Sequence, residues 1–218
     1  MKIYTDLFDR IISPENLFEA WESFKRDKRN KADVMEFERN LEKNIFQLHR
    51  SLKSGIYRHS RYYGFYIRDP KQRHIHKANV RDRVLHHAIF SVVNPIFEET
   101  FIATSFSCRI GFGTHKGVDA LERVARGIGQ NGTSDCFVLK CDVQKFFDSV
   151  DHEILISILK KRIKDEKVIW LLCSIIESYD STASETRERD CAPQRNTHWQ
   201  PYIAAFRQRL YERVGSIH

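Results

Sequence analysis

The chain has 218 residues, of which 41% are hydrophobic, so it can bury a sizeable core in one or two domains. Its net charge of +7 favours a polyanionic partner, nucleic acid before membrane, although plain solubility would give the same balance. No apolar stretch is long enough to span a membrane and the start lacks a signal-peptide core, which predicts a cytoplasmic location. The five cysteines include no C-x-x-C pair and no regular spacing, so they support neither a zinc ribbon nor a disulfide framework.

Two helices are predicted in the first 56 residues. Ser13 and Pro14 are typical of an N-cap followed by a first helical position, and this helix is expected to run to about Lys28. Apolar residues spaced by threes and fours from Val34 to Leu52 predict one further helix. Gly55 is a suitable C-terminal cap for it.

A β-hairpin is predicted between Tyr57 and Ala78, where Tyr, Phe and Ile are frequent and Asp69-Pro70-Lys71-Gln72 forms a turn. Cations near its tip are mixed with aromatic residues, which suits a surface that binds phosphates and stacks bases. A two-stranded ribbon with a solvated outer face would have much the same composition. The cations are Arg68, Lys71, Arg73 and Lys77.

A helix is expected from Val80 to Asn94, because Pro95 disfavours helical geometry in the residue before it. His86 and His87 are adjacent on this helix and point in different directions, so we interpret them as structural or RNA-facing rather than as metal ligands. Phe101 to Gly113 is predicted to be irregular, with Arg109 among small residues. Further helices are predicted at His115–Ile128, His152–Ile163 and Val168–Tyr179.

The stretch from Phe137 to His152, FVLKCDVQKFFDSVDH, is the most informative in the chain. Phe137 to Leu139 are predicted to form a short buried strand, and Asp142 follows near its C-terminal end. A carboxylate at the end of a strand is well placed to bind a metal ion. An ordinary aspartate that caps the next turn or helix would give the same local pattern.

Taken in order, these segments resemble the bacterial reverse transcriptases of the group II intron, retron and diversity-generating types. The resemblance covers roughly Leu7 to Tyr179. Three motifs carry it: DPKQRHIHKANVRDRVLHHAI, PIFEETFIATSFSCRIGFGTHKGVDAL and LKCDVQKFFDSVDHEIL. The resemblance implies an α+β fold in which N-terminal helices precede the fingers and a partial palm of a right-hand polymerase.

The resemblance also implies roles for particular residues. Asp142 matches the family's motif A aspartate, which binds two catalytic magnesium ions, and the carbonyl of Val143 is a further potential ligand. Phe147 matches the bulky residue that selects deoxynucleotides by crowding the sugar 2′ position. Arg73 matches the cation that packs on the incoming nucleotide, with Lys71 or Lys77 at its triphosphate. The cations expected to contact nucleic acid are Arg68, Arg81, Arg83 and Arg109.

The chain departs from the family after about Ser181, because the Y-x-D-D hairpin that supplies the remaining metal-binding carboxylates is absent. Back-translating Gln194 to Ile217 and advancing one base permits KGIPIGNLTSQLFANVYMNELDQF, which contains the family motif G-[LI]-P-[IL]-G-N-x-T-S-Q. We therefore hypothesise a frameshift between about residues 181 and 194. The expected organisation is an N-terminal helical region (1–56), fingers (57–136), a partial palm (137–181) and a non-native tail (182–218).

Three functional hypotheses follow. The first is a truncated RNA-directed DNA polymerase of mobile-element type, whose intact parent would use an RNA template, a DNA or RNA primer, deoxynucleoside triphosphates and two Mg²⁺ ions. The second is a catalytically silent RNA-binding module derived from such an enzyme. The third is an unstable pseudogene product. The sequence leaves the oligomeric state open.

Overall fold

The computed structural model describes residues 2–68, 72–107, 109–143, 146 and 149–179, apart from the side chain of Arg73. The chain divides into two compact units. Among the described residues, the first unit combines residues 2–93 with residues 151–179, and the second comprises residues 94–150. Two segments that are distant in the sequence therefore fold together as the first unit. The expected non-native tail lies outside the described residues.

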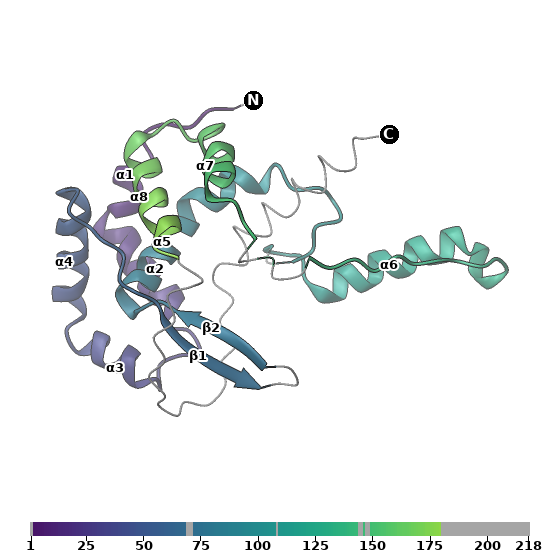
Figure 1. Cartoon of the computed structure of the whole chain (residues 1–218), viewed down its shortest axis with the longest axis horizontal. Coiled ribbons are helices and arrows are strands. Elements are labelled where there is room, and N and C mark those ends of the chain that lie inside the picture. Colours follow the sequence, from purple (N-terminus) through teal and green to yellow (C-terminus); the bar gives the residue numbers. More distant parts are fainter. Residues whose placement is uncertain (1, 69–71, 108, 144–145, 147–148, 180–218) are drawn as a thin grey trace. The chain divides into compact units, whose positions relative to one another are not determined.

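The chain begins with four helices: α1 (Phe8–Ile12), α2 (Pro14–Phe24), α3 (Ala32–Arg39) and α4 (Leu41–Lys53) (Figure 1). The predicted start of α2 is confirmed, because Ser13 Oγ accepts a hydrogen bond from the Asn16 amide at 3.2 Å. The helix ends at Phe24, before the expected Lys28, and Asp27 then adopts a left-handed φ of 59°.

The single helix predicted between Val34 and Leu52 is wrong, because α3 and α4 are separated at Asn40. The backbone of Asn40 has φ −125° and ψ 37°, outside the helical region. The side-chain amide of Asn44 donates to the carbonyl of Phe37 at 2.9 Å, which satisfies one of the last carbonyls of α3. The predicted cap is confirmed at Gly55, whose φ is 68°.

The predicted hairpin is confirmed and leads directly into a long helix. Strands β1 (Tyr63–Arg68) and β2 (Gln72–Lys77) pair antiparallel, with Tyr63 opposite Lys77 and Arg68 opposite Gln72. Helix α5 (Val80–Glu98) passes through Pro95, so the expected end at Asn94 is wrong. Burial of Ile96 and Phe97 beyond the proline offsets the hydrogen bond that the proline cannot donate.

Helices α7 (His152–Lys160) and α8 (Glu166–Glu177) confirm the helical pair predicted after the palm motif. Asp165 joins α8 to the start of the chain. Its Oδ1 accepts hydrogen bonds from the amides of Lys167 and Val168 in α8. Its Oδ2 accepts from the amides of Leu7 and Phe8, at 2.8 and 2.9 Å, where α1 begins. One carboxylate thus caps two helices that are more than 150 residues apart in the sequence.

The first unit has a hydrophobic core to which α2, α4, α5 and α8 all contribute. Its large side chains are almost completely excluded from solvent, and burying each one stabilises the fold by about 1.5–3 kcal/mol. They include Leu17, Trp21, Phe24, Ile45, Leu48, Leu52, Leu85, Leu171 and Ile175. The core holds the end of the hairpin that continues into α5. No helix among the described residues is long and apolar enough to cross a membrane.

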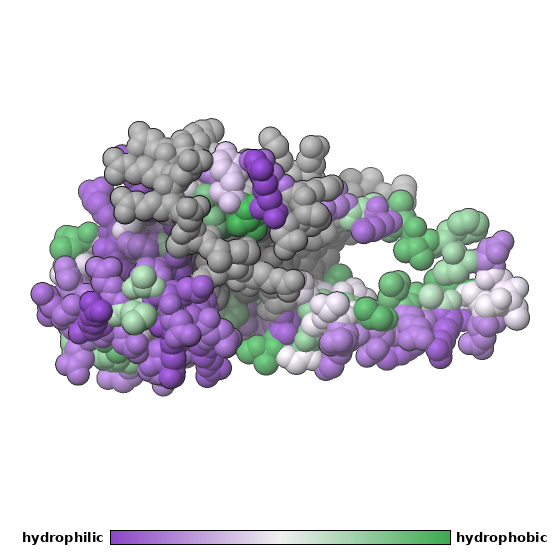
Figure 2. Space-filling view, turned by 90° about the horizontal axis from the view of Figure 1, so that it is seen from below, coloured by the Kyte–Doolittle hydropathy of each residue, from purple (hydrophilic) through white to green (hydrophobic). Residues whose placement is uncertain are grey.

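The second unit contains the end of α5, helix α6 (Thr114–Ile128), the short helix η1 (Gln130–Gly132) and the segment that follows. The predicted helix at His115–Ile128 is confirmed by α6. Its apolar residues are exposed, and Figure 2 shows green, apolar side chains beside an open gap in this part of the molecule. They are Val118, Leu121, Val124 and Ile128.

The buried strand predicted at Phe137 to Leu139 is wrong. These residues have no strand pairing, and Phe137 and Leu139 are 93% and 88% exposed. A strand needs partner strands for its backbone groups and an apolar layer to cover it. Within the described residues the only sheet is the hairpin of β1 and β2, so the motif has no sheet to join. The polymerase fingers and palm therefore remain a prediction.

Candidate nucleic-acid interface

The hairpin presents two chemically different faces, which follow from its register. Phe65 opposite Ile75 and Tyr63 opposite Lys77 lie on one face, together with the Ile67–Arg73 pair. The other face carries Gly64 opposite His76, Tyr66 opposite His74, and Arg68 opposite Gln72. Lys77, a β2 cation predicted to bind a nucleotide, therefore lies on one face, whereas Arg68 belongs to the opposite one.

Three arginines on and before β1 are exposed. Arg58 and Arg61 precede the strand and Arg68 ends it. Within the described chain no ion pair involves any of their side chains. Guanidinium groups that are free of internal carboxylates can form bidentate contacts with phosphate. The nucleic-acid contact of Arg68 stays a prediction, and Arg68 is exposed. Arg58 and Arg61 were not predicted, because they lie outside the motifs that carry the family resemblance.

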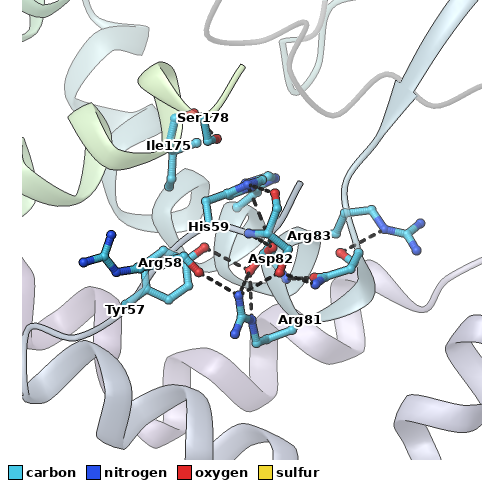
Figure 3. Close-up of polar contacts among 11 residues, drawn as sticks. Tyr57, Arg58, His59, Arg81, Asp82, Arg83, Ile175 and Ser178 are labelled. Carbon is cyan, nitrogen blue, oxygen red and sulfur yellow. Dashed lines mark hydrogen bonds and ion pairs between the residues drawn. The ribbon is translucent and has the colours of Figure 1, made fainter. Parts of the chain in front are cut away.

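A buried carboxylate, Asp82, fixes the hairpin to α5 (Figure 3). Its Oδ1 accepts hydrogen bonds from the Tyr57 hydroxyl at 3.0 Å and from Arg81 Nε at 2.9 Å. Its Oδ2 accepts from the Ser60 amide at 2.9 Å. The Asp82 amide is itself held by the side chain of Asn79. The residues before β1 are therefore tied to the first turn of α5.

Arg81 belongs to this network, and its predicted contact with nucleic acid is restricted by it. Its guanidinium also donates to the carbonyl of Arg58 at 2.8 Å and to Ser60 Oγ at 3.0 Å. It lies over the ring of Tyr57 at 5.3 Å. Burial and the neighbouring Asp82 carboxylate raise the pKa of Tyr57 above its usual range, so its hydroxyl remains a donor.

His59 and His86 form a stacked, hydrogen-bonded pair beside Asp82. Their rings are nearly parallel with centroids 5.1 Å apart, and their Nε2 atoms are 3.1 Å apart. His59 Nδ1 lies 2.7 Å from the Ser60 carbonyl, so it must carry a proton, and the Nε2 of neutral His59 accepts from His86. His86 is buried, which confirms a structural place for it. Burial lowers the pKa of His59 although the Asp82 carboxylate acts against this.

The lowered pKa of His59 predicts a pH-dependent stability. Below the ordinary histidine pKa of about 6.5 the unfolded chain binds a proton at this site more readily than the folded chain. The free energy of unfolding should therefore fall as the pH decreases from about 7.5 to 5.5. Denaturant unfolding at each pH should show that the free energy of unfolding falls less steeply with decreasing pH in His59→Gln than in the wild type. His115→Gln, which removes an exposed imidazole, should keep the wild-type dependence; an unchanged dependence in His59→Gln would contradict the assignment.

Asp33 binds two of the predicted cations. It accepts from Lys77 Nζ at 2.8 Å and from Arg83 Nη2 at 2.6 Å. Burial raises the pKa of Asp33, but the two cations outweigh this and lower it overall. The Arg83 side chain is only 5% exposed and lies over the ring of Phe24. We therefore interpret Arg83 as part of the interior of the first unit, because it cannot reach phosphate from there.

Arg109, another cation predicted to bind nucleic acid, organises the loop of the second unit. It forms an ion pair with Glu98 at 2.7 Å and donates to the carbonyls of Ile102 and Ser105. Its guanidinium lies 3.9 Å from the ring centroid of Phe112. These contacts occupy its N–H donors and hold the irregular segment after α5. We therefore interpret Arg109 as a residue that stabilises this loop.

The predicted metal ligand Asp142 lies in the second unit, in an exposed segment without regular structure. Its Oδ1 accepts a hydrogen bond from the amide of Val143. The described residues contain no cluster of three or more His, Cys, Asp or Glu side chains that could hold a metal ion. They therefore do not fit a two-magnesium site. Asp151, in contrast, caps α7, because its Oδ1 accepts a hydrogen bond from the Ile154 amide at 3.0 Å.

Three of the predicted nucleotide-binding positions cannot be compared with the structure. Lys71 and Phe147 lie outside the described residues, and only the backbone of Arg73 is described. The network around Asp82 was not predicted from the sequence. A local signal was present, because this aspartate stands between two arginines in the first turn of a helix. Its partners Tyr57 and Ser60 are more than 20 residues away, so no periodicity connects them to it.

Comparison with known proteins relates the chain to intron maturases at low identity. It is 31% identical over 100 residues to nuclear intron maturase 1, mitochondrial, of Arabidopsis thaliana, covering 46% of this chain and 13% of that protein. It is 27% identical over 177 residues to nuclear intron maturase 4, mitochondrial, of the same plant, covering 80% and 21%.

A bacterial protein is also similar. The chain is 25% identical over 149 residues to protein YkfC of Escherichia coli strain K12, covering 63% of this chain and 39% of that protein. The chain thus spans less than half the length of each of these curated relatives. No protein-family model matches it. Membership of the bacterial reverse transcriptases stays a prediction.

Proposed function

We propose that the chain is an RNA-binding protein related to intron-encoded reverse transcriptases, and that it holds RNA without polymerising deoxynucleotides. The observation that carries this proposal is the group of exposed arginines Arg58, Arg61 and Arg68, which have no ion-pair partner in the described chain and adjoin exposed Tyr63 and Tyr66. Guanidinium groups bind phosphates and aromatic rings stack on bases.

The relatives and the charge support the same proposal. Two of the similar proteins are named intron maturases, and an intron transcript is RNA. The net charge of +7 favours a polyanionic partner. The network around Asp82 would keep Arg58 and Arg61 beside α5. The cationic segment would then already be ordered before RNA binds, which lowers the entropy cost of binding.

Template-primed polymerisation is the second candidate, and the motif around Asp142 favours it. A two-metal mechanism needs further carboxylates beside this one, and the described residues do not supply them. We therefore assign polymerisation to an intact parent enzyme. In such a parent, Asp142 would bind Mg²⁺, Phe147 would select the sugar, and RNA template, primer and deoxynucleoside triphosphates would be the partners.

The proposal is tested by measuring the binding of dye-labelled single-stranded RNA by fluorescence anisotropy over a series of salt concentrations. We expect the affinity to fall linearly with salt on logarithmic axes, because binding releases counterions from the phosphates. Absence of binding at low salt would overturn the proposal. A parallel primer-extension reaction with Mg²⁺ should show no incorporation, and incorporation would restore the polymerase hypothesis for this chain.

A further inference from the structure

A continuous series of aromatic and imidazole rings runs from the hairpin to the Asp82 network in the first unit. Each ring contacts the next with centroids 4.3 to 5.7 Å apart. The series ends at His86, which is buried on α5. In order, its members are Tyr66, His74, His76, Tyr179, Tyr62, His59 and His86.

The outer end of the ring series is exposed. Tyr66 is 52% exposed, and its ring stacks on His74 with centroids 4.5 Å apart and an interplanar angle of 22°. Arg68 and Gln72 are exposed on the same face of the hairpin. Arg68 lies two residues beyond Tyr66, about 6.7 Å along the strand. A flat ring and a cation thus stand side by side on the same face of the hairpin.

The support beneath Tyr66 depends on a glycine. A Cβ atom at Gly64 would lie 2.6 Å from Nε2 of His74, so the His74 ring occupies space that only glycine leaves open. The His74 ring also contacts the rings of both Tyr66 and His76. The orientation of Tyr66 is therefore set before any ligand arrives, which reduces the entropy lost on binding.

We infer that this face of the hairpin binds unpaired RNA nucleotides, with a base stacked on Tyr66 and a neighbouring phosphate on Arg68. The inference rests on the proposed function and specifies the form of RNA. An unpaired base can extend the ring series, whereas the bases of an RNA duplex are already stacked and their faces are closed to a tyrosine. The charge of Arg68 selects a polyanion over an apolar peptide.

This surface is separate from the nucleotide-binding positions implied by the family resemblance. Lys77, one of these positions, lies on the opposite face of the hairpin by register. Lys77 is also held by Asp33 at 2.8 Å. The two faces can therefore be tested independently by substitution.

The experiment compares three polymers for binding to the full chain by fluorescence anisotropy: a single-stranded oligouridylate of about 10 nucleotides, an abasic ribose-phosphate polymer of the same charge, and an RNA duplex. The wild-type protein should bind the oligouridylate more tightly than either of the others. Tyr66→Ala should weaken oligouridylate binding by about 5- to 150-fold, the range for one stacked base, while abasic binding stays unchanged. Tyr66→Phe should bind like wild type.

Gly64→Ala provides a second variant that leaves Tyr66 in place and displaces its support. It should weaken oligouridylate binding by less than Tyr66→Ala does. Equal binding of the oligouridylate and the abasic polymer by wild type, or unchanged binding by Tyr66→Ala, would overturn the stacking site while leaving salt-dependent RNA binding intact. Failure of wild type to bind any of the three polymers would overturn the proposed function as well.

Discussion

Replacing Asp82 with alanine is expected to lower the free energy of unfolding by about 3–5 kcal/mol. The carboxylate is fully buried and accepts hydrogen bonds from Tyr57, Ser60 and Arg81. Alanine would leave the Tyr57 hydroxyl and the Ser60 amide without their acceptor, away from water. Urea denaturation followed by circular dichroism measures the change.

Two further variants define the scale of this effect. Tyr57→Phe removes one hydrogen bond to the carboxylate and should cost about 1.5–3 kcal/mol. Asp9→Ala removes an exposed carboxylate near the start of α1 and should cost less than about 1 kcal/mol. A loss in Asp82→Ala no greater than that in Asp9→Ala would show that the network does not stabilise the fold.

Replacing Arg58, Arg61 and Arg68 together with glutamine is expected to weaken binding of single-stranded RNA roughly 100-fold at about 0.1 M salt. The slope of log affinity against log salt concentration should become shallower by about 0.7 for each phosphate that the variant no longer neutralises. Three phosphates therefore change the slope by about 2. The three side chains are exposed, so the fold should be unaffected. A salt titration by fluorescence anisotropy gives both values.

The matched control replaces Arg39, Lys43 and Arg50 with glutamine. These cations of α3 and α4 are also exposed, and both triple variants reduce the net charge from +7 to +4, since 7 − 3 = 4. The control should retain most of the wild-type affinity. If both variants weaken binding equally, the protein attracts RNA through its overall charge, and the arginines at the hairpin have no special part.

Features of the fold that depend on neighbouring residues were predictable, whereas those that depend on tertiary contacts were not. The cap at Ser13 and the two strands of the hairpin follow from patterns in neighbouring residues, and both predictions are confirmed. Helix α5 passes through Pro95 because the burial of Ile96 and Phe97 beyond it offsets the missing hydrogen bond, and local sequence does not reveal that burial. The strand predicted at Phe137 to Leu139 is wrong because a strand requires neighbouring strands, and the described residues provide none beside it.

In the candidate site, too, local features were predictable from the sequence and tertiary contacts were not. The sequence indicated cations and aromatic residues on a hairpin, and exposed Arg68 agrees with that pattern. It gave no sign that Arg83 meets Asp33, 50 residues away, or that Arg109 meets Glu98. A motif specifies that an arginine is present, but the carboxylates folded against that arginine decide whether it is available to phosphate.

The double cap at Asp165 constrains the order in which the protein can fold during synthesis. Helix α1 begins on a carboxylate that the ribosome adds more than 150 residues later, and the Tyr4–Ile163 bridge has the same span. The core is also incomplete until Leu171 and Ile175 have been added. The N-terminal helices must therefore leave the ribosome without their partners and stay incompletely buried while residues 94–150 are made. During this time their apolar side chains are exposed and can be bound by a chaperone.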